Sequence, residues 1–548
     1  MKLLRQLMEQ QHERGYLSDE NLREISRNQK IPLYRLEELV SFYPAFRREA
    51  PKQFTIDVCR DACCQMAENS ASRQVLLNTL NQQNVDYELR EVSCLGRCDA
   101  APAVAVNDNP IAPRTLNDIE VKTALGNTAP HNGSHGESAD ASPLTSKWKS
   151  DLYQSIDERY RVVKELVGSE KDLSQTCIEL LKGTNLTGRG GAGFPTGLKW
   201  ELVTKEQAET KYVICNADES EPGTFKDREI IRHAPHLIIE GMLLAGLTIG
   251  AESGIIYIRH EYGPEEAILK QALEDAYKQG LLGENAAESG KRFEVEVFTS
   301  PGGYILGEET ALLEALEDKR GEPRNKPPYP GQFGLWGKPT LINNVETFAV
   351  APSIIGNGPQ WWADQGIGEF EGVKFVCISG DVKSPGVFEV PMGTTFATVI
   401  EMAGGVRDNK SVKAFLPGGA SSLFLKPEFL ETPIDFPAVK KVGSMLGTGA
   451  IMIFDEDRNL YDIATNITRF FRNESCGKCV PCRVGSEKGV AILESVFNGE
   501  YAASQLQVLD ELHETLEETS ICGLGQVALA PVISMLKQFP EEIPSHGN

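Results

Sequence analysis

Residues 188–200 read GRGGAGFPTGLKW, and the pattern of the chain around this run decides the fold. Closely spaced glycines let backbone N–H groups approach an anion, and a helix that begins just after them adds a favourable dipole. The run does not follow the GxGxxG spacing of an ordinary Rossmann nucleotide site, so that site is not indicated. A glycine-rich run alone is often only a turn, and its meaning depends on the segments around it.

Strands and helices alternate on both sides of this run. Strands are predicted at residues 212–215, 255–258 and 293–298, and helices at 264–279 and 308–317, which indicates an α/β layer. Four polar segments follow: NADESEPGTFKDRE, SPGGYILGEETALLEALE, NKPPYP and PTLINNVETF. Each of these segments, taken alone, is typical of an ordinary polar loop with turn residues. Because α/β folds bind ligands at the ends of their strands, the set together predicts a ligand site.

Length and charge limit the class of protein. The 548 residues suffice for roughly three to five domains. A net charge of −23 opposes nonspecific nucleic-acid binding, which needs a positive surface. The longest apolar stretch, residues 236–250, is broken by Glu240, so no transmembrane span is expected. The N-terminus lacks the apolar core of a signal peptide, and we expect a cytoplasmic protein.

Eight of the twelve cysteines fall into two sets, and the first lies near the N-terminus. Predicted strands lead to Cys59 and Cys94, with Cys64 and Cys98 close behind them. Four thiolates on two loops suit a [2Fe–2S] cluster, and structural zinc is the alternative. Cys63, beside Cys64, leaves open which of the two is the ligand. Apart from the two sets, we expect Cys63, Cys177, Cys215 and Cys377 to be ordinary core or surface thiols.

The second set lies in a helical C-terminal part. Cys476, Cys479 and Cys482 stand in ESCGKCVPCR, and Cys522 stands in SICGLGQ. Three ligands spaced C-x2-C-x2-C plus one distant cysteine predict a [4Fe–4S] cluster. Zinc sites more often show two separated pairs.

The N-terminal part resembles a known module. From GYLSDENLREI, which begins at Gly15, to CLGRCDAAPAV, which begins at Cys94, it is similar to the thioredoxin-like [2Fe–2S] subunit of respiratory complex I. The resemblance covers residues 1–125, including a helical preface. The family spaces its first pair C-x4-C, which implies Cys59 and Cys64 as ligands and makes Cys63 an extra thiol.

Residues 150–535 resemble the flavin-bearing, NADH-oxidising subunit of complex I. They are also similar to the diaphorase subunits of NAD-linked formate dehydrogenases and bidirectional hydrogenases. The resemblance implies FMN at Gly188, Arg189, Gly190, Gly191, Lys199, Asn216, Asp218, Glu219, Ser220, Tyr304, Gly307, Glu308, Asn343, Asn344 and Thr347. It places NAD(H) over the flavin, beside Phe194, Glu221, Glu309, Lys326 and Tyr329. Leu306 departs from the family pattern, which has cysteine there.

The resemblances imply an α/β multidomain protein. We expect a helical preface and thioredoxin-like [2Fe–2S] domain over 1–125 and a linker over 126–146. An α/β FMN- and NAD(H)-binding domain over 147–365 follows, and then a β-grasp, SLBB-like domain over 366–452. We expect a spacer or docking role for the SLBB-like domain because it holds no obvious ligand set. A helical bundle with the [4Fe–4S] cluster completes the chain over 453–548.

The implied activity is hydride transfer between NAD(H) and FMN, with single electrons passed through the clusters to or from partner subunits. The cofactors carry this chemistry, so no general base is expected. The fused modules, without a C-terminal ferredoxin extension, favour the beta subunit of a molybdenum- or tungsten-dependent formate dehydrogenase, whose alpha subunit would be the partner. A hydrogenase or another NADH-dependent reductase is the alternative partner. A redox sensor or assembly module without flavin turnover is the alternative from another class.

Overall fold

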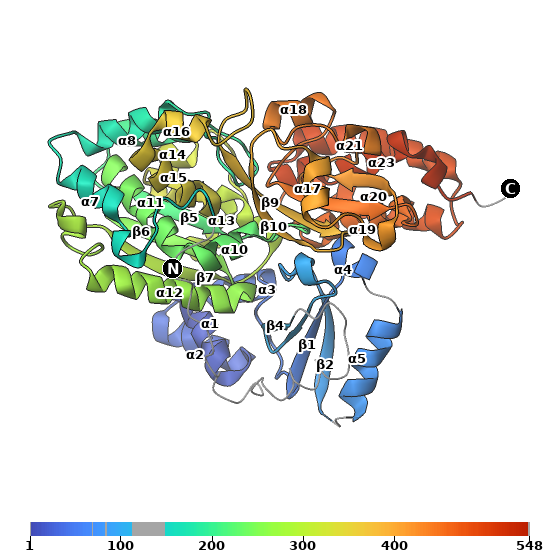
Figure 1. Ribbon diagram of the computed structural model, residues 1–548. Coiled ribbons are helices and arrows are strands. Elements are labelled where there is room, and N and C mark those ends of the chain that lie inside the picture. The colour runs from blue at the N-terminus through green and yellow to red at the C-terminus, as the bar shows by residue number, and fades with distance from the viewer. Residues whose placement is uncertain (1, 68–69, 83–84, 112–147, 546–548) are drawn as a thin grey trace.

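A parallel sheet of four strands, in the order β7-β6-β5-β8, lies in the left part of the molecule in Figure 1. We call this sheet and the helices around it the central domain, from its place in the chain. This computed structural model describes residues 2–67, 70–82, 85–111 and 148–545; the expected linker at 126–146 lies outside them. The strands are β5 (Tyr212–Ala217), β6 (Ser253–Arg259), β7 (Glu294–Ser300) and β8 (Thr340–Asn344). The helices around them are α7 (Arg161–Val167), α8 (Leu173–Lys182), α9 (Thr196–Lys205), α10 (Lys226–His233), α11 (Pro235–Ile249), α12 (Gly263–Lys278), α13 (Glu309–Leu316), α14 (Pro330–Phe333), α15 (Val345–Asn357) and α16 (Pro359–Ala363).

Helix α11 is the most deeply buried element of this domain. Nearly all of its apolar side chains are enclosed, and Glu240 is buried with them. The helix crosses α15 so closely that a Cβ on Gly241 would stand 2.1 Å from the carbonyl oxygen of Phe348. In the described part of the chain no single helix is long and apolar enough to cross a membrane; only α10 and α11 together, bent by 94°, have that length and composition.

Three N-terminal helices, α1 (Lys2–Arg14), α2 (Asp19–Gln29) and α3 (Leu33–Phe42), pack beneath the parallel-sheet domain (Figure 1). Ser18 caps α2 by accepting from the backbone N–H of Asn21. Buried leucines of α1 and α3 share one core with Phe298 of β7 and Leu312 of α13. The helical preface therefore belongs to the core of the central domain.

A separate four-stranded sheet, in the order β2-β1-β3-β4, lies beside these helices. Its elements are β1 (Phe54–Cys59), α4 (Ala62–Ala67), α5 (Ser70–Gln82), β2 (Tyr87–Val92), β3 (Val104–Val106) and β4 (Asn109–Ile111). β1 pairs parallel to β2 and antiparallel to β3. Cys59 ends β1 and Cys94 follows β2, so adjacent parallel strands deliver both cysteine loops to one edge.

The last two parts of the chain pack against each other (Figure 1). A mixed sheet, β10-β9-β12-β11, is built from β9 (Val373–Gly380), β10 (Gly386–Pro391), α17 (Phe396–Met402), β11 (Val412–Leu416), α18 (Phe436–Lys441) and β12 (Ala450–Asp455). The helical part contains α19 (Leu460–Asn473), α20 (Val480–Phe497), α21 (Val508–Thr519), α22 (Gly523–Val527) and α23 (Ala530–Gln538). The expected mixture of α/β, sheet and helical parts is confirmed, while the exact domain boundaries stay a prediction.

Candidate functional site

The glycine-rich loop lies against the carboxyl end of β8. A Cβ on Gly190 would stand 3.3 Å from the Cβ of Asn344. Gly191 and Gly193 have φ values of +111° and +67°, and a Cβ on either would meet nothing within 4 Å. Positive φ suits glycine, and the open space leaves the backbone of the loop accessible. The loop leads directly into α9, which begins at Thr196.

Neighbouring strands bring the other predicted groups to this edge. Asn216 of β5 lies opposite Asn344 of β8 in register. The amide of Asn216 donates to the carbonyl oxygen of Gly307 at 2.9 Å. Asp218 is buried, and its Oδ2 has no hydrogen bond to the described residues. Burial raises the pKa of Asp218 to about 6. A buried acceptor without a partner fits a hydroxyl-bearing ligand.

Three predicted side chains turn away from this edge. The Arg189 guanidinium donates to the carbonyl oxygen of Val373 at 3.1 Å. Glu219 accepts from the backbone N–H groups of Asp227 and Arg228 at 3.0 and 3.2 Å. Asn343 is buried, and one orientation of its amide accepts from the Trp200 indole at 2.9 Å. Their side chains therefore hold neighbouring elements in place.

The mouth of the site carries exposed rings and mixed charges. Phe194 is 43% and Tyr329 57% exposed, so both rings are accessible to a ligand. The Lys326 ammonium contacts both Glu308 and Glu309, at 2.9 and 3.3 Å. The predicted ribose carboxylate Glu309 is therefore held by a lysine three residues before the predicted stacking ring of Tyr329.

Glu221 lies deeper and joins two domains. Its carboxylate accepts from the backbone N–H of Ser421 at 2.8 Å and from the Ser421 hydroxyl. A Cβ on Gly419 would stand 2.8 Å from the same carboxylate, so the β9–β12 domain approaches closely here. Burial raises the pKa of Glu221 to about 7. The expected spacer or docking domain thus also contacts a predicted nucleotide-site residue, which no motif in residues 373–450 indicates.

The second cysteine set gathers at helix N-termini. Cys479 directly precedes α20, and Cys522 directly precedes α22. A Cβ on Gly525 would stand 2.9 Å from the Cβ of Cys482, so this glycine lets the two loops approach. Burial raises the pKa of Cys482 to about 11 and that of Cys522 to about 12. Such thiols ionise at neutral pH when a cationic centre replaces the proton, which fits metal ligation.

The first cysteine set is deeply buried. Cys94 Sγ lies 3.4 Å from Cys98 Sγ. Cys59 lies in hydrogen-bonding contact with Cys64 and Cys94. Among the described residues, no group of three or more Cys, His, Asp or Glu side chains is placed so that it could hold a metal ion. The cysteines are free thiols that contact one another, and they fit a cluster by their number and their chemistry.

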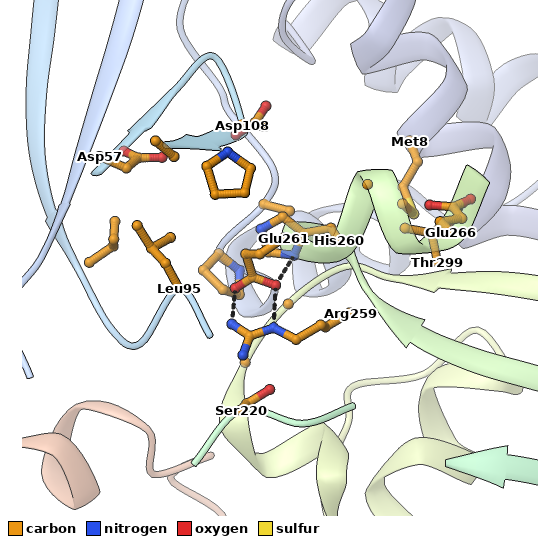
Figure 2. A pocket seen from close by; sticks show the side chains of 18 of the residues that line it. Met8, Asp57, Leu95, Asp108, Ser220, Arg259, His260, Glu261, Glu266 and Thr299 are labelled. Atoms are coloured by element: carbon orange, nitrogen blue, oxygen red, sulfur yellow. Dashed lines mark hydrogen bonds and ion pairs between the residues drawn. The ribbon is translucent and has the colours of Figure 1, made fainter. Parts of the chain in front are cut away.

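A cleft of about 2130 Å³ runs between the first cysteine module and the central domain. In Figure 2, Asp57, Leu95 and Asp108 line it from the module, Met8 from α1, and Arg259, Glu261 and Glu266 from the central domain. Its wall also includes Cys94, Ser220, Tyr304 and Cys476. The cleft therefore reaches one cysteine of each set and two predicted flavin residues.

Comparison with known proteins decides the family. Family models match over residues 1–124 (Thioredoxin-like [2Fe-2S] ferredoxin), 181–353 (Nuo51 FMN-binding domain), 375–424 (SLBB domain) and 462–546 (NADH-ubiquinone oxidoreductase-F iron-sulfur binding region). The NADH-quinone oxidoreductase F subunit of Aquifex aeolicus (strain VF5) is 46% identical over 403 residues, which are 73% of this chain and 93% of that protein. The chain belongs to the family of NADH-quinone oxidoreductase F subunits.

Similar proteins also include subunits of hydrogenases. NADP-reducing hydrogenase subunit HndC of Solidesulfovibrio fructosivorans is 41% identical over 397 residues, 72% of this chain and 81% of that protein. A crystal structure of NAD+-reducing [NiFe]-hydrogenase in the H2-reduced state matches with a TM-score of 0.84 and 30% identity, covering 99% of this chain and 92% of that chain.

These findings confirm FMN, NADH, a [2Fe–2S] cluster and a [4Fe–4S] cluster as the groups that this member of the family uses, and NADH oxidation as its activity. They do not test individual contacts, so the residue assignments stay predictions.

Sequence reasoning missed Glu474, which links all three cofactor regions. Its carboxylate accepts from the Ser93 hydroxyl, beside Cys94, and from the backbone N–H of Tyr304 at 2.8 Å. It also lies two residues before Cys476. Its place in ESCGKCVPCR is visible in the sequence, but nothing there shows which segments its carboxylate contacts.

Proposed function

We propose that FMN lies on the 188–193 loop and the carboxyl ends of β5 and β8, and that NAD(H) enters past Phe194 and Tyr329. The observation that carries this proposal is the convergence of the open glycine loop with Asn216, Asp218 and Asn344. The open space at Gly191 and Gly193 suits close approach of the FMN phosphate, and the buried Asp218 acceptor suits a ribityl hydroxyl.

The residues of the chain bind and orient the reactants. FMN held there would supply hydride acceptance from NADH and release of electrons one at a time. Phe194 and Tyr329 offer flat apolar surface to the adenine. Glu309 is placed to accept from a ribose 2′-hydroxyl and to repel a 2′-phosphate. Glu221, held by Ser421, closes the inner end of the site.

We propose that Cys476, Cys479, Cys482 and Cys522 would hold the [4Fe–4S] cluster, and that this site, with Tyr304 beside it, would connect the flavin site to a partner subunit. Tyr304 packs at 4.9 Å on the Phe470 ring of α19, the helix that leads to these cysteines. The Cys59, Cys64, Cys94 and Cys98 site of the N-terminal module serves as a second electron store or exit.

We further propose that the partner is the catalytic subunit of an NAD-linked complex in the cytoplasm. The match to the NAD+-reducing hydrogenase over nearly the whole of both chains supports a hydrogenase partner. The fusion of both iron–sulfur modules to the flavin domain supports a formate dehydrogenase alpha subunit equally well.

The test uses the complex purified from its source through a tag on this chain. We expect about one FMN per chain, NADH-dependent reduction of ferricyanide, and NAD+ reduction with either formate or H2. The substrate that supports NAD+ reduction identifies the partner. An iron-loaded, folded chain that neither holds nor takes up FMN would contradict the proposal and favour a redox sensor or assembly module.

A further inference from the structure

The first cysteine set contains five buried thiols, one more than a [2Fe–2S] cluster needs. Cys59, Cys63, Cys64, Cys94 and Cys98 are each at most 4% exposed. Four sulfur donors complete the coordination of two irons in such a cluster. The fifth thiol therefore has no part in the ligand set proposed above, although it lies within the same enclosure.

Cys63 and Cys64 lie next to different cysteines of this set. They are neighbours on α4, and helix geometry turns successive side chains about 100° apart. The Cys64 sulfur accepts from the backbone N–H of Ala103 at 3.4 Å and contacts Cys59. The Cys63 thiol instead lies in hydrogen-bonding contact with Cys98. Cys63 is thus the thiol adjacent to the Cys98 position.

The surroundings hold the Cys63 sulfur in that place. Ser379 Oγ of β9 lies 3.3 Å from it, and Met452 Sδ of β12 lies 3.5 Å from it. On the other side, the backbone N–H of Gly223 donates to Cys98 Sγ at 3.3 Å. A sulfur that moved from Cys63 toward the Cys98 position would approach the same N–H donor.

The distance along the chain from Cys59 to Cys63 also matches a spacing that this site already uses. Three residues separate Cys59 from Cys63, and three residues separate Cys94 from Cys98. A Cys59–Cys63 pair would therefore have the same C-x3-C spacing as the proposed Cys94–Cys98 ligand pair.

We propose that Cys63 is a reserve ligand of the [2Fe–2S] site, whose thiolate completes the coordination when the Cys98 sulfur is lost. The proposal rests on the ligand set proposed above. One thiolate takes the place of another, so the charge of the site is unchanged and no electron is transferred. The Cys63 proton is released to solvent as its sulfur–iron bond forms.

The test compares Cys98→Ala with Cys98→Ala/Cys63→Ala in the full chain, purified without oxygen. We expect the single variant to keep most of the [2Fe–2S] EPR signal after dithionite reduction, with altered g-values, and the double variant to lose it. Cys63→Ala should keep the signal. Cys94→Ala is the matched control and should lose it, because Cys63 contacts Cys98.

FMN content and the [4Fe–4S] signal report whether each variant is folded. Equal loss of the [2Fe–2S] signal in Cys98→Ala and in the double variant overturns the proposal. Loss of the signal in Cys63→Ala also overturns it, because Cys63 would then be an ordinary ligand.

If Cys98→Ala is insoluble, Cys98→Ser and Cys98→Ser/Cys63→Ala replace the pair, and identical g-values in the two overturn the proposal. A missing [2Fe–2S] signal in the unaltered chain would instead contradict the ligand set on which the proposal rests. If such a chain still holds FMN and oxidises NADH, the flavin part of the proposed function is unaffected.

Discussion

Glu309 stands between two cations at the mouth of the proposed nucleotide site. Lys326 lies 3.3 Å and Lys199 lies 3.9 Å from its carboxylate. The neutral variant Glu309→Gln would remove the negative charge beside both lysines, so that their positive charges attract the 2′-phosphate of NADPH more strongly. We expect the NADH-over-NADPH ratio of kcat/KM to fall by about tenfold, which corresponds to about 1.4 kcal/mol in this partly screened position.

Steady-state kinetics with both nucleotides measures this ratio. Glu314→Gln is the matched control, because Glu314 lies on the same helix but pairs with Arg324. Equal use of NADH and NADPH by the unaltered chain would show that Glu309 does not face the ribose.

Glu474 places one negative charge among three cofactor regions. We predict that Glu474→Gln raises the midpoint potentials of both clusters, because a nearby negative charge disfavours the added electron. The amide keeps an acceptor for the backbone N–H of Tyr304. EPR-monitored redox titration gives both potentials. Glu494→Gln, on the surface of α20 and paired with Arg469, is the control. Unchanged potentials for both clusters would limit Glu474 to a packing role.

At the scale of the helix, Glu240 links α11 to the segment before α7. Its carboxylate accepts from the Tyr153 hydroxyl at 2.7 and 2.8 Å and from the backbone N–H of Val163 at 3.2 Å. Burial raises the pKa of Glu240 from 4.5 to about 7. Since the folded state disfavours the ionised form, the stability supported by the neutral carboxyl is complete below about pH 4.5 and is lost as the pH rises to about 7.

Glu240→Gln should therefore remove a pH-dependent part of the free energy of unfolding. Relative to this variant, the free energy of unfolding of the unaltered chain should fall by up to about 3 kcal/mol between pH 4.5 and 7. Chemical denaturation at a series of pH values measures the difference. Glu252→Gln, on the exposed turn after α11, should show no such trend. A constant difference across this range would mean that Glu240 is already ionised at low pH.

Three of the four strands of the central sheet are predictable because their sequence signal is local, whereas β8 is expected only as part of a polar segment. Short apolar runs bounded by polar loops indicate strands at residues 212–215, 255–258 and 293–298, and β5, β6 and β7 contain nearly all of these positions. The side-chain directions of Arg189 and Glu219 are not predictable in this way. They depend on partners more than a hundred residues away or on the turn into α10, and motif matching gives a residue its position without its orientation.

At the scale of the whole molecule, buried arginines join the Cys94–Cys98 loop of the first cysteine set to the central domain. Arg228 donates to the carbonyl oxygen of Gly96 at 2.6 Å and pairs with Asp99 at 2.7 Å. Arg259 donates to the carbonyl oxygen of Cys94. The sequence predicts two modules joined by a linker, and local patterns carry no information about this interface. Because buried charges need these partners, the loop is fixed relative to the flavin site.

The N-terminal helices are the second tie between the modules, and they decide the effect of shortening the chain. Leu4, Leu7, Leu36 and Leu39 are fully enclosed in the core shared with β7 and α13. Leu4 also donates its backbone N–H to Asp318 at 2.9 Å. Full burial of one such side chain contributes about 1.5–3 kcal/mol, so the set is comparable to the stability of an ordinary domain.

We therefore predict that deleting residues 2–49, which leaves every proposed cofactor ligand in place, lowers the melting temperature and increases binding of an apolar dye. Lys2→Ala is the control for a change at the exposed N-terminal end. Differential scanning fluorimetry and size-exclusion chromatography measure stability and aggregation. If the shortened chain stays monomeric with an unchanged melting temperature, the α1–α3 contacts contribute nothing to the central domain. FMN should be lost along with stability, because the same core supports α13, whose N-terminus carries Glu308 and Glu309.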